Sequence, residues 1–282
     1  MATEKLPSLM SLLFASFGTS KKGVKIGSSD FTLTKTYGNY HIDTKNLKRY
    51  NAFFSIKSEF PVTYLFLISM RSQLAVMNDK TFPISVMGLV HLGNTFDMKS
   101  KIDISKALNM ETTVTIPAKE EGSLFPTVKT NFYQDNKLVA EGEGFFIAKR
   151  KRKTEKKAEE TPEPEAPKRT AFYAEELVYP KNMGWKYAAV SGDYNPIHLS
   201  SFLAKNFGFK SSIAHGWNSA SRVFACVEKQ TGKELKSIKV NFKTPIALPD
   251  KVKLELYKEA YGSTGYKVTN RKDEMCLEGV IA

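Results

Sequence analysis

Cysteine and histidine are scarce in this sequence of 282 residues, which contains two cysteines and four histidines. Cys226 and Cys276 lie in apolar segments and lack the spacing of metal ligands. A disulfide framework and a zinc site therefore have no support, and we expect no bound metal. With so few thiols, a reducing cytoplasmic environment is the expected location.

Long hydrophobic runs are also missing. The longest one, residues 62–70, is bounded by Pro61 and Arg71 and is well short of the roughly 20 residues that a membrane-spanning helix needs. The N-terminal stretch MATEKLPSLMSLLFASFGTS contains Glu4, Pro7 and several serines and has no clear cleavage site. We therefore expect a packed or interfacial helix there rather than a signal peptide, and no membrane span.

Negative charge is outweighed by positive charge, and the formal net charge is +13. Such an excess attracts an acidic partner, which can be a nucleic acid, an anionic membrane or an acidic acyl carrier, while lysines on solvated faces explain most of it without any partner. The segment KRKRKTEKKAEETPEPEAPKR, residues 149–169, mixes both charges with three prolines. It predicts a charged linker over residues 149–170, and its acidic second half argues against nucleic-acid binding.

The two halves beside this linker repeat one order of elements. Each begins with an apolar helical pattern and continues with strand patterns and a hairpin that ends in Glu-Gly. The corresponding ranges are the helices 61–77 and 214–229, the strands 84–92, 110–116, 237–242 and 251–257, and the hairpins 128–142 and 268–279. The repeat predicts two α+β units, residues 1–148 and residues 171–282.

The second half contains the octapeptide SGDYNPIH, residues 191–198. Gly192, Asn195 and Pro196 disfavour a continuous helix, so we expect Asp193 and His198 on an ordered loop. Taken singly, Asp193 is more readily a turn cap and His198 a buried structural histidine. An acid and an imidazole held together in one loop, however, favour acid-base chemistry.

The wider segment, residues 187–198 with Ala204, resembles the signature of the MaoC-like, R-specific enoyl-thioester hydratases (hydratase 2). Further matches are GF at 208–209, IAHGW at 213–217, VNFKTP at 240–245 and LPD at 248–250. The resemblance implies a hot-dog fold, in which an antiparallel sheet wraps a long helix. Two such units imply the double hot-dog arrangement, and the absence of a GDxNPxH motif from residues 1–148 implies that the first unit is degenerate and lacks the catalytic loop.

The same resemblance assigns roles to residues. It implies that Asp193 and His198 hold one water molecule, that Asn195 steadies their loop, and that the Gly216 N–H, near a helix start at about residue 214, stabilises the oxyanion. His215 has no chemical role in this family and is expected to be structural. Trp217 is expected in the core, with a shortened acyl pocket as the alternative.

The implied activity is reversible hydration of trans-2-enoyl thioesters, or dehydration of (R)-3-hydroxyacyl thioesters, in fatty-acid metabolism. Coenzyme A or acyl carrier protein carries the substrate, and no cofactor is needed. The alternatives are a non-catalytic acyl-thioester-binding protein and a thioesterase on the same fold. Two fused units predict a monomeric pseudo-dimer, and a homodimer stays open. The residues Tyr64, Phe66, Leu67 and Met70 are expected to serve packing, with an acyl-chain tunnel as the alternative that the resemblance leaves open.

Overall fold

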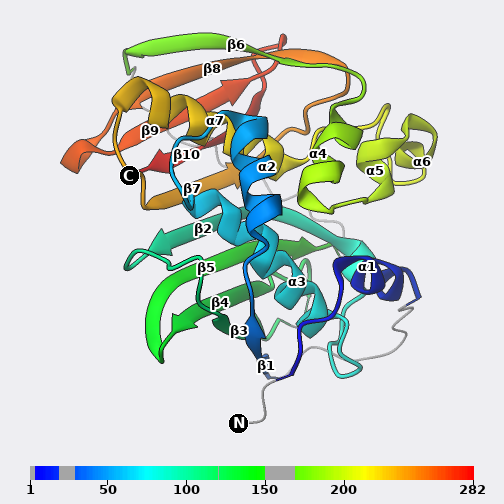
Figure 1. The fold of residues 1–282 in the computed structure, drawn as a ribbon. Helices are drawn as coiled ribbons and strands as arrows, with labels where there is room; N and C mark the ends of the chain where they lie inside the picture. Colours follow the sequence, from blue (N-terminus) through cyan, green and yellow to red (C-terminus); the bar gives the residue numbers. More distant parts are fainter. Residues whose placement is uncertain (1–3, 19–28, 120, 150–168) are drawn as a thin grey trace.

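A computed structural model describes residues 4–18, 29–119, 121–149 and 169–282. Most of the predicted linker, residues 149–170, lies outside these ranges. Ten antiparallel strands form one continuous sheet in the order β1-β3-β4-β5-β2-β7-β10-β9-β8-β6. The first five strands belong to the first unit and the last five to the second (Figure 1).

The two units repeat one topology, since β1-β3-β4-β5-β2 in the first corresponds to β6-β8-β9-β10-β7 in the second. The first unit contains α1 (Leu9–Gly18), β1 (Phe31–Tyr40), α2 (Thr44–Phe54), η1 (Val62–Tyr64), α3 (Leu65–Met77), η2 (Val86–Gly88), β2 (Leu89–Met98), β3 (Leu108–Ile116), β4 (Thr127–Gln134) and β5 (Lys137–Ala148). The second contains β6 (Tyr173–Tyr179), α4 (Met183–Ser191), α5 (Pro196–Leu199), α6 (Ser201–Lys205), α7 (Gly216–Thr231), β7 (Ser237–Phe242), β8 (Asp250–Lys258), η3 (Ala260–Gly262), β9 (Thr264–Thr269) and β10 (Met275–Ile281). The predicted α+β repeat is therefore present.

The helices α3 and α7 lie at the centres of the two units (Figure 1). Ten of the thirteen residues of α3 are buried, as expected for a helix that is apolar on all sides. Tyr64, Phe66, Leu67 and Met70 all belong to the core, which fits the packing role expected for them. In the part of the chain that the structure describes, no helix is long and apolar enough to cross a membrane.

Several element boundaries differ from those predicted. The strand expected at residues 84–92 begins only at Leu89, after the short turn η2, and continues to Met98. Buried and partly exposed positions alternate from Asn94 to Met98, but the buried polar Asn94 hid this alternation from the hydrophobic pattern. The elements β1, α2, β6 and α4 were not predicted, whereas a helix near the N-terminus, α1, was.

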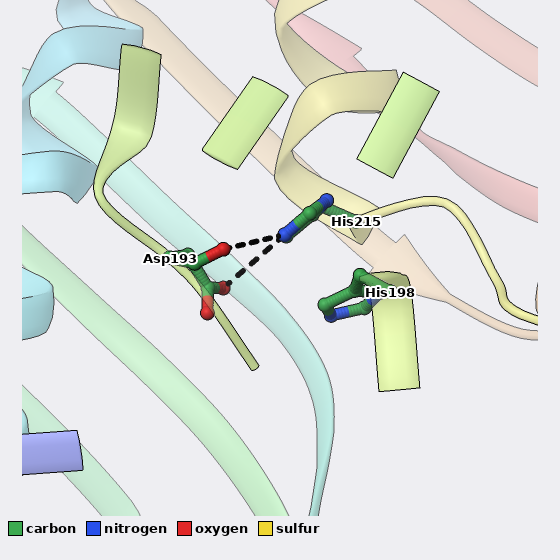
Figure 2. A group of neighbouring side chains, drawn as sticks. All are labelled: Asp193, His198 and His215. Carbon is green, nitrogen blue, oxygen red and sulfur yellow. Dashed lines mark hydrogen bonds and ion pairs between the residues drawn. The ribbon is translucent and has the colours of Figure 1, made fainter. Parts of the chain in front are cut away.

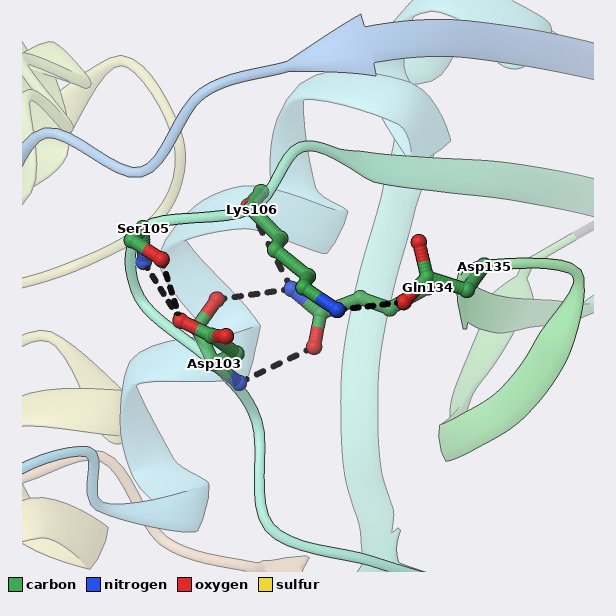
Figure 3. A network of polar contacts seen from close by, with 5 residues as sticks. All are labelled: Asp103, Ser105, Lys106, Gln134 and Asp135. Carbon is green, nitrogen blue, oxygen red and sulfur yellow. Dashed lines mark hydrogen bonds and ion pairs between the residues drawn. The ribbon is translucent and has the colours of Figure 1, made fainter.

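A polar network fixes the connection from β2 to β3 (Figure 3). The Gln134 side chain accepts from the Asp103 N–H at 2.9 Å and donates to the Asp103 carbonyl at 2.7 Å. Asp103 Oδ1 accepts from the backbone and hydroxyl of Ser105, and Lys106 Nζ pairs with Asp135 at 2.6 Å. These groups satisfy one another at the β4–β5 turn, which indicates a role in the fold rather than in binding.

The two units meet where β2 pairs with β7, over the register from Gly93–Asn241 to Asp97–Ser237. A Cβ placed on Gly93 would overlap the carbonyl oxygen of Val240. Only glycine lets the two backbones approach this closely. The seam between the units, which is the pairing of β2 with β7, therefore requires a residue without a side chain at position 93.

We expect Gly93→Ala to destabilise the protein by about 1–3 kcal/mol, because the added methyl group forces the strands of the seam apart. The measurement is the urea midpoint and melting temperature. Gly88→Ala is the matched control, since a Cβ there meets no atom within 4 Å, and its stability should be unchanged or rise by up to about 1 kcal/mol. Equal stability of the two variants would contradict this account of the seam.

Candidate active site

The octapeptide connects α4 to α5. Gly192 ends α4 with φ +77°, in the left-handed region that glycine adopts without strain. Asp193 follows on the loop, as predicted. His198 does not lie on the loop but in the short helix α5, because Asn195 caps that helix and Pro196 occupies its first position.

Three hydrogen bonds hold the backbone and carboxylate of Asp193. Its N–H donates to the Ser191 hydroxyl at 3.1 Å, and its Oδ1 accepts from the Asn195 N–H at 3.1 Å. Its carbonyl accepts from His215 Nε2 at 3.0 Å (Figure 2). Asn195 therefore steadies the loop in two ways, because its N–H holds Asp193 and its side chain accepts from the Ile197 N–H at 3.4 Å.

His198 is oriented by the segment that precedes α7. Its Nδ1 lies 2.9 Å from the carbonyl of Ile213; a carbonyl only accepts, so Nδ1 carries the proton and Nε2 keeps its lone pair. Although His198 retains some solvent exposure, burial is the largest influence on its pKa and lowers it, while the nearby Asp193 carboxylate acts in the opposite direction. The ring is thus neutral at neutral pH.

The helix α4 packs against the backbone of His198 at Gly184. A Cβ placed on Gly184 would overlap the backbone carbonyl of His198. This close approach packs α5 onto α4, and it was not predicted from the sequence. A glycine inside a helical pattern is the signal that points to such a contact.

His215 immediately precedes α7 and is buried, with 2% of its surface exposed. Its ring stacks on that of His198 with the centroids 3.7 Å apart. Burial, reinforced by the neighbouring His198, holds the pKa of His215 well below its ordinary value. The sequence assigned this residue only a structural role, and only the fold reveals that it touches both Asp193 and His198.

Gly216 is the first residue of α7, two positions later than the predicted start at about residue 214. The first N–H groups of a helix have no intrahelical acceptor and form its positive end. Because Gly216 follows His215 directly, this end lies beside the Asp193 and His198 pair. The structure thus brings together all four predicted site residues, Asp193, Asn195, His198 and Gly216.

Aromatic side chains from both units pack against this region. Phe242 lies against Gly216, where a Cβ would meet its ring at 2.8 Å. His91, on β2 of the first unit, stacks on Phe146 at 4.8 Å and meets Phe242 edge-on at 5.2 Å. Burial lowers the pKa of His91 to about 4, and the charge of Asp193 opposes that shift. Sequence reasoning missed His91, because no local pattern indicates that its strand lies beside the second unit.

Trp217 lies in the core, as predicted. It is 2% exposed, stacks on Phe66 at 4.5 Å and donates from Nε1 to the carbonyl of Thr63 at 2.9 Å. These contacts hold the start of α7 against the first unit.

A depression of about 690 Å³ lies among α2, α4, α7 and β6. None of the four predicted site residues lines it, so it is separate from the candidate site.

Asp193, His198 and His215 offer ligand atoms that all lie within 4.8 Å of one another, a spacing that fits a divalent metal ion. The ring nitrogen of His215 that faces Asp193 already donates its proton to a carbonyl, however. A metal ligand needs a free lone pair at that nitrogen. The hydrogen-bond pattern therefore favours acid-base chemistry over metal binding.

Comparison with known proteins agrees with this geometry. Residues 152–275 match the family described as MaoC like domain. The chain is 28% identical over 241 residues to 3-hydroxyacyl-thioester dehydratase X of Mycobacterium tuberculosis, covering 84% of each protein.

Two solved structures extend the comparison to the whole fold. The crystal structure of HtdX of Mycobacterium tuberculosis has a TM-score of 0.71 at 25% identity, over 88% of this chain and 99% of that one. A conserved hypothetical protein of the same organism, described as a double hotdog fold, has a TM-score of 0.55 at 10% identity, over 92% and 96% of the two chains. The second half of the chain is therefore similar to the MaoC like domain, and the chain has the double hot-dog fold over its length.

Proposed function

We propose that this protein is a hydro-lyase that reversibly hydrates trans-2-enoyl thioesters and dehydrates (R)-3-hydroxyacyl thioesters. The observation that carries the proposal is the placement of the Asp193 carboxylate and a ring nitrogen of His198 within 4.8 Å of each other, beside the start of α7. The relative named as a 3-hydroxyacyl-thioester dehydratase supports the same reaction class.

The separation of the two groups suits one water molecule between them. Two hydrogen bonds of about 2.8 Å that meet at a tetrahedral oxygen join acceptors about 4.6 Å apart. The Asp193 carboxylate and the unprotonated Nε2 of His198 both accept, so the water donates both protons and turns its lone pair toward the substrate. This arrangement favours attack of the water on the β-carbon.

In hydration, His198 Nε2 takes the proton of the attacking water while the new C–O bond forms. The π electrons of the double bond move onto the thioester oxygen, and the nearby Asp193 carboxylate stabilises the imidazolium. His198 then returns its proton to the α-carbon, so atoms and charge balance. Dehydration is the reverse, with His198 removing the α-proton and then protonating the leaving hydroxyl.

The enolate oxygen requires donors that are already in place. The N–H of Gly216 at the positive end of α7 is the donor we assign, and loss of such a donor slows an enzyme by about 100- to 1,000-fold. The absent side chain lets the ring of Phe242 pack directly against the backbone of Gly216. The chemistry then needs only protein groups and no cofactor.

The two units divide the work in this proposal. Residues 171–282 form the catalytic unit and residues 1–148 form a degenerate unit without an acid-base loop, while the charged linker expected over residues 149–170 lies mostly outside the described residues. Since two units are already fused, we propose a monomeric pseudo-dimer that acts on coenzyme A or acyl-carrier-protein thioesters and does not bind nucleic acid. Both cysteines are free and buried, which is consistent with the cytoplasm.

Purified protein mixed with crotonyl-CoA should bleach the enoyl absorbance. Asp193→Asn and His198→Gln should each slow the reaction by about 100- to 10,000-fold, because each removes one partner of the water. Release of free thiol, followed with a thiol-reactive dye, would indicate a thioesterase instead. Binding without turnover across short, medium and long substrates on both carriers would indicate a non-catalytic acyl-binding protein.

The reaction should depend on pH through His198. Burial lowers its pKa below the ordinary 6.5, so the ring stays neutral at pH 7 and gains its proton only at lower pH. We expect kcat/KM for hydration to be flat near pH 7 and to fall on the acid side with a midpoint below 6.5, measured as a pH–rate profile. A midpoint above 6.5 would contradict the assignment of His198 as the base.

Gly184→Ala should impair catalysis although Gly184 lies outside the reacting groups. Its methyl group would displace the His198 backbone, and a shift of about 1 Å in a catalytic group costs about 100-fold in rate. Steady-state kinetics measure the loss, and Gly88→Ala is the control with open space around the new methyl group. Wild-type kcat in Gly184→Ala would refute the tight packing of α5 on α4.

A further inference from the structure

One buried histidine has no part in the mechanism above and nevertheless touches every component of it. His215 donates from Nε2 to the Asp193 carbonyl at 3.0 Å and lies 3.9 Å from Asp193 Oδ2. Its ring covers that of His198, with 28° between the ring planes. The next residue along the chain is Gly216, the first of α7. The side chain of His215 thus links the acid-base loop to the imidazole, and its backbone leads directly to the proposed oxyanion donor.

The protonation of His215 follows from its surroundings. The carbonyl of Asp193 only accepts, so Nε2 carries the proton. Nδ1 is buried and has no hydrogen-bond partner in the described parts of the chain. A second proton on Nδ1 would leave a buried N–H without an acceptor and would place a positive charge against His198, and both effects are costly. His215 is therefore held neutral, as the Nε2–H tautomer.

His198 has the opposite tautomer, with its proton on Nδ1 and directed to Ile213. The stacked pair can accept one proton, and the free lone pair suited to receive it is Nε2 of His198. The other groups that face the pair are the Asp193 carboxylate and the ring of Tyr187, which lies 4.8 Å from His215. A neutral His215 fills the space beside His198 without competing for the proton.

We propose that His215 is a positioning residue for the hydro-lyase reaction: its Nε2–H fixes the Asp193 backbone, and its ring face fixes the plane of the His198 imidazole. This inference rests on the proposed function. It replaces the purely structural role expected from the sequence. It also explains why a polar ring is buried between α4 and the start of α7, where an aliphatic side chain would fill the space equally well.

Two substitutions separate the two contacts. His215→Gln keeps an N–H near the position of Nε2 but loses the ring, whereas His215→Phe keeps a ring face but loses the donor. With the donor removed, the Asp193 loop is free to shift, and we expect His215→Phe to lower kcat by about 100-fold. His215→Gln should recover at least about tenfold of that loss. KM should change little in both variants, since neither contact is made to the substrate.

The pH profile distinguishes positioning from direct catalysis. Because His215 stays neutral, its variants should keep the acid limb of wild type, with the midpoint still set by His198. Loss of that limb in both variants would overturn the proposal, because His215 would then be the titrating acid or base. Wild-type kcat in His215→Phe would overturn it as well. His41→Gln, which alters an exposed histidine of the first unit, is the matched control.

A second measurement does not depend on activity. The chain has four histidines, so imidazole ¹⁵N signals can be assigned by substituting each in turn. We expect the Nε2–H tautomer for His215 and the Nδ1–H tautomer for His198 between pH 7 and 8, the latter lost in His215→Gln, which removes the stacked ring, and retained in His215→Phe, which keeps it. Protonation of His215 in this range, or an unchanged His198 in both variants, would refute the positioning role.

The two readouts also separate this inference from the proposed function. Wild type that is inactive but shows the expected tautomers would reject the hydro-lyase proposal and keep the histidine arrangement. An active wild type whose two His215 variants match it in kcat would reject the inference alone. Melting temperatures separate an effect on folding from an effect on positioning. If the Gln and Phe variants melt at the same temperature but differ in kcat, the difference is one of positioning. If both lose stability and have the same kcat, the effect is on folding, and this result would count against the proposal.

Discussion

The antiparallel pairing of β2 with β7 is the interaction on which the rest of the structure depends. It joins two five-stranded sheets into one, over a register that begins at Gly93 and Asn241. Once the sheets are joined, α7 lies against the first unit, and Trp217 donates to Thr63 and stacks on Phe66. The start of α7, and with it the Gly216 N–H, is therefore placed by contacts that neither unit makes alone.

Buried neutral histidines lie at this junction, and their surroundings determine which of them can exchange a proton. A buried imidazole disfavours the charged form, so its pKa decreases unless an anion compensates. Asp193 acts as such an anion on His198, whereas burial and the neighbouring His198 dominate at His215, whose Nδ1 has no hydrogen-bond partner among the described residues. Two similar side chains in contact thereby differ in function, since one is suited to exchange a proton and the other to remain neutral.

The first unit contributes to this environment although it has no acid-base loop. His91 and Phe146 come from its strands and pack beside Phe242 of the second unit. Burial of His91 there lowers its pKa, and in the proposed mechanism such a low-dielectric surrounding strengthens the interaction between Asp193 and His198. The first unit thus packs beside the proposed site that the second unit carries.

The sequence alone predicted the α+β class and the two repeated units, because apolar periodicities are short-range signals, and its resemblance to the MaoC-like hydratases predicted the double hot-dog fold and the site residues Asp193, Asn195, His198 and Gly216. The comparisons confirm the MaoC-like resemblance and the double hot-dog fold. Tertiary structure alone decided where β2 begins, how Gly184 supports His198 and what His215 contacts. Those features depend on backbones and rings that are distant in sequence and close in space, and no local pattern records which groups meet when two units share one sheet.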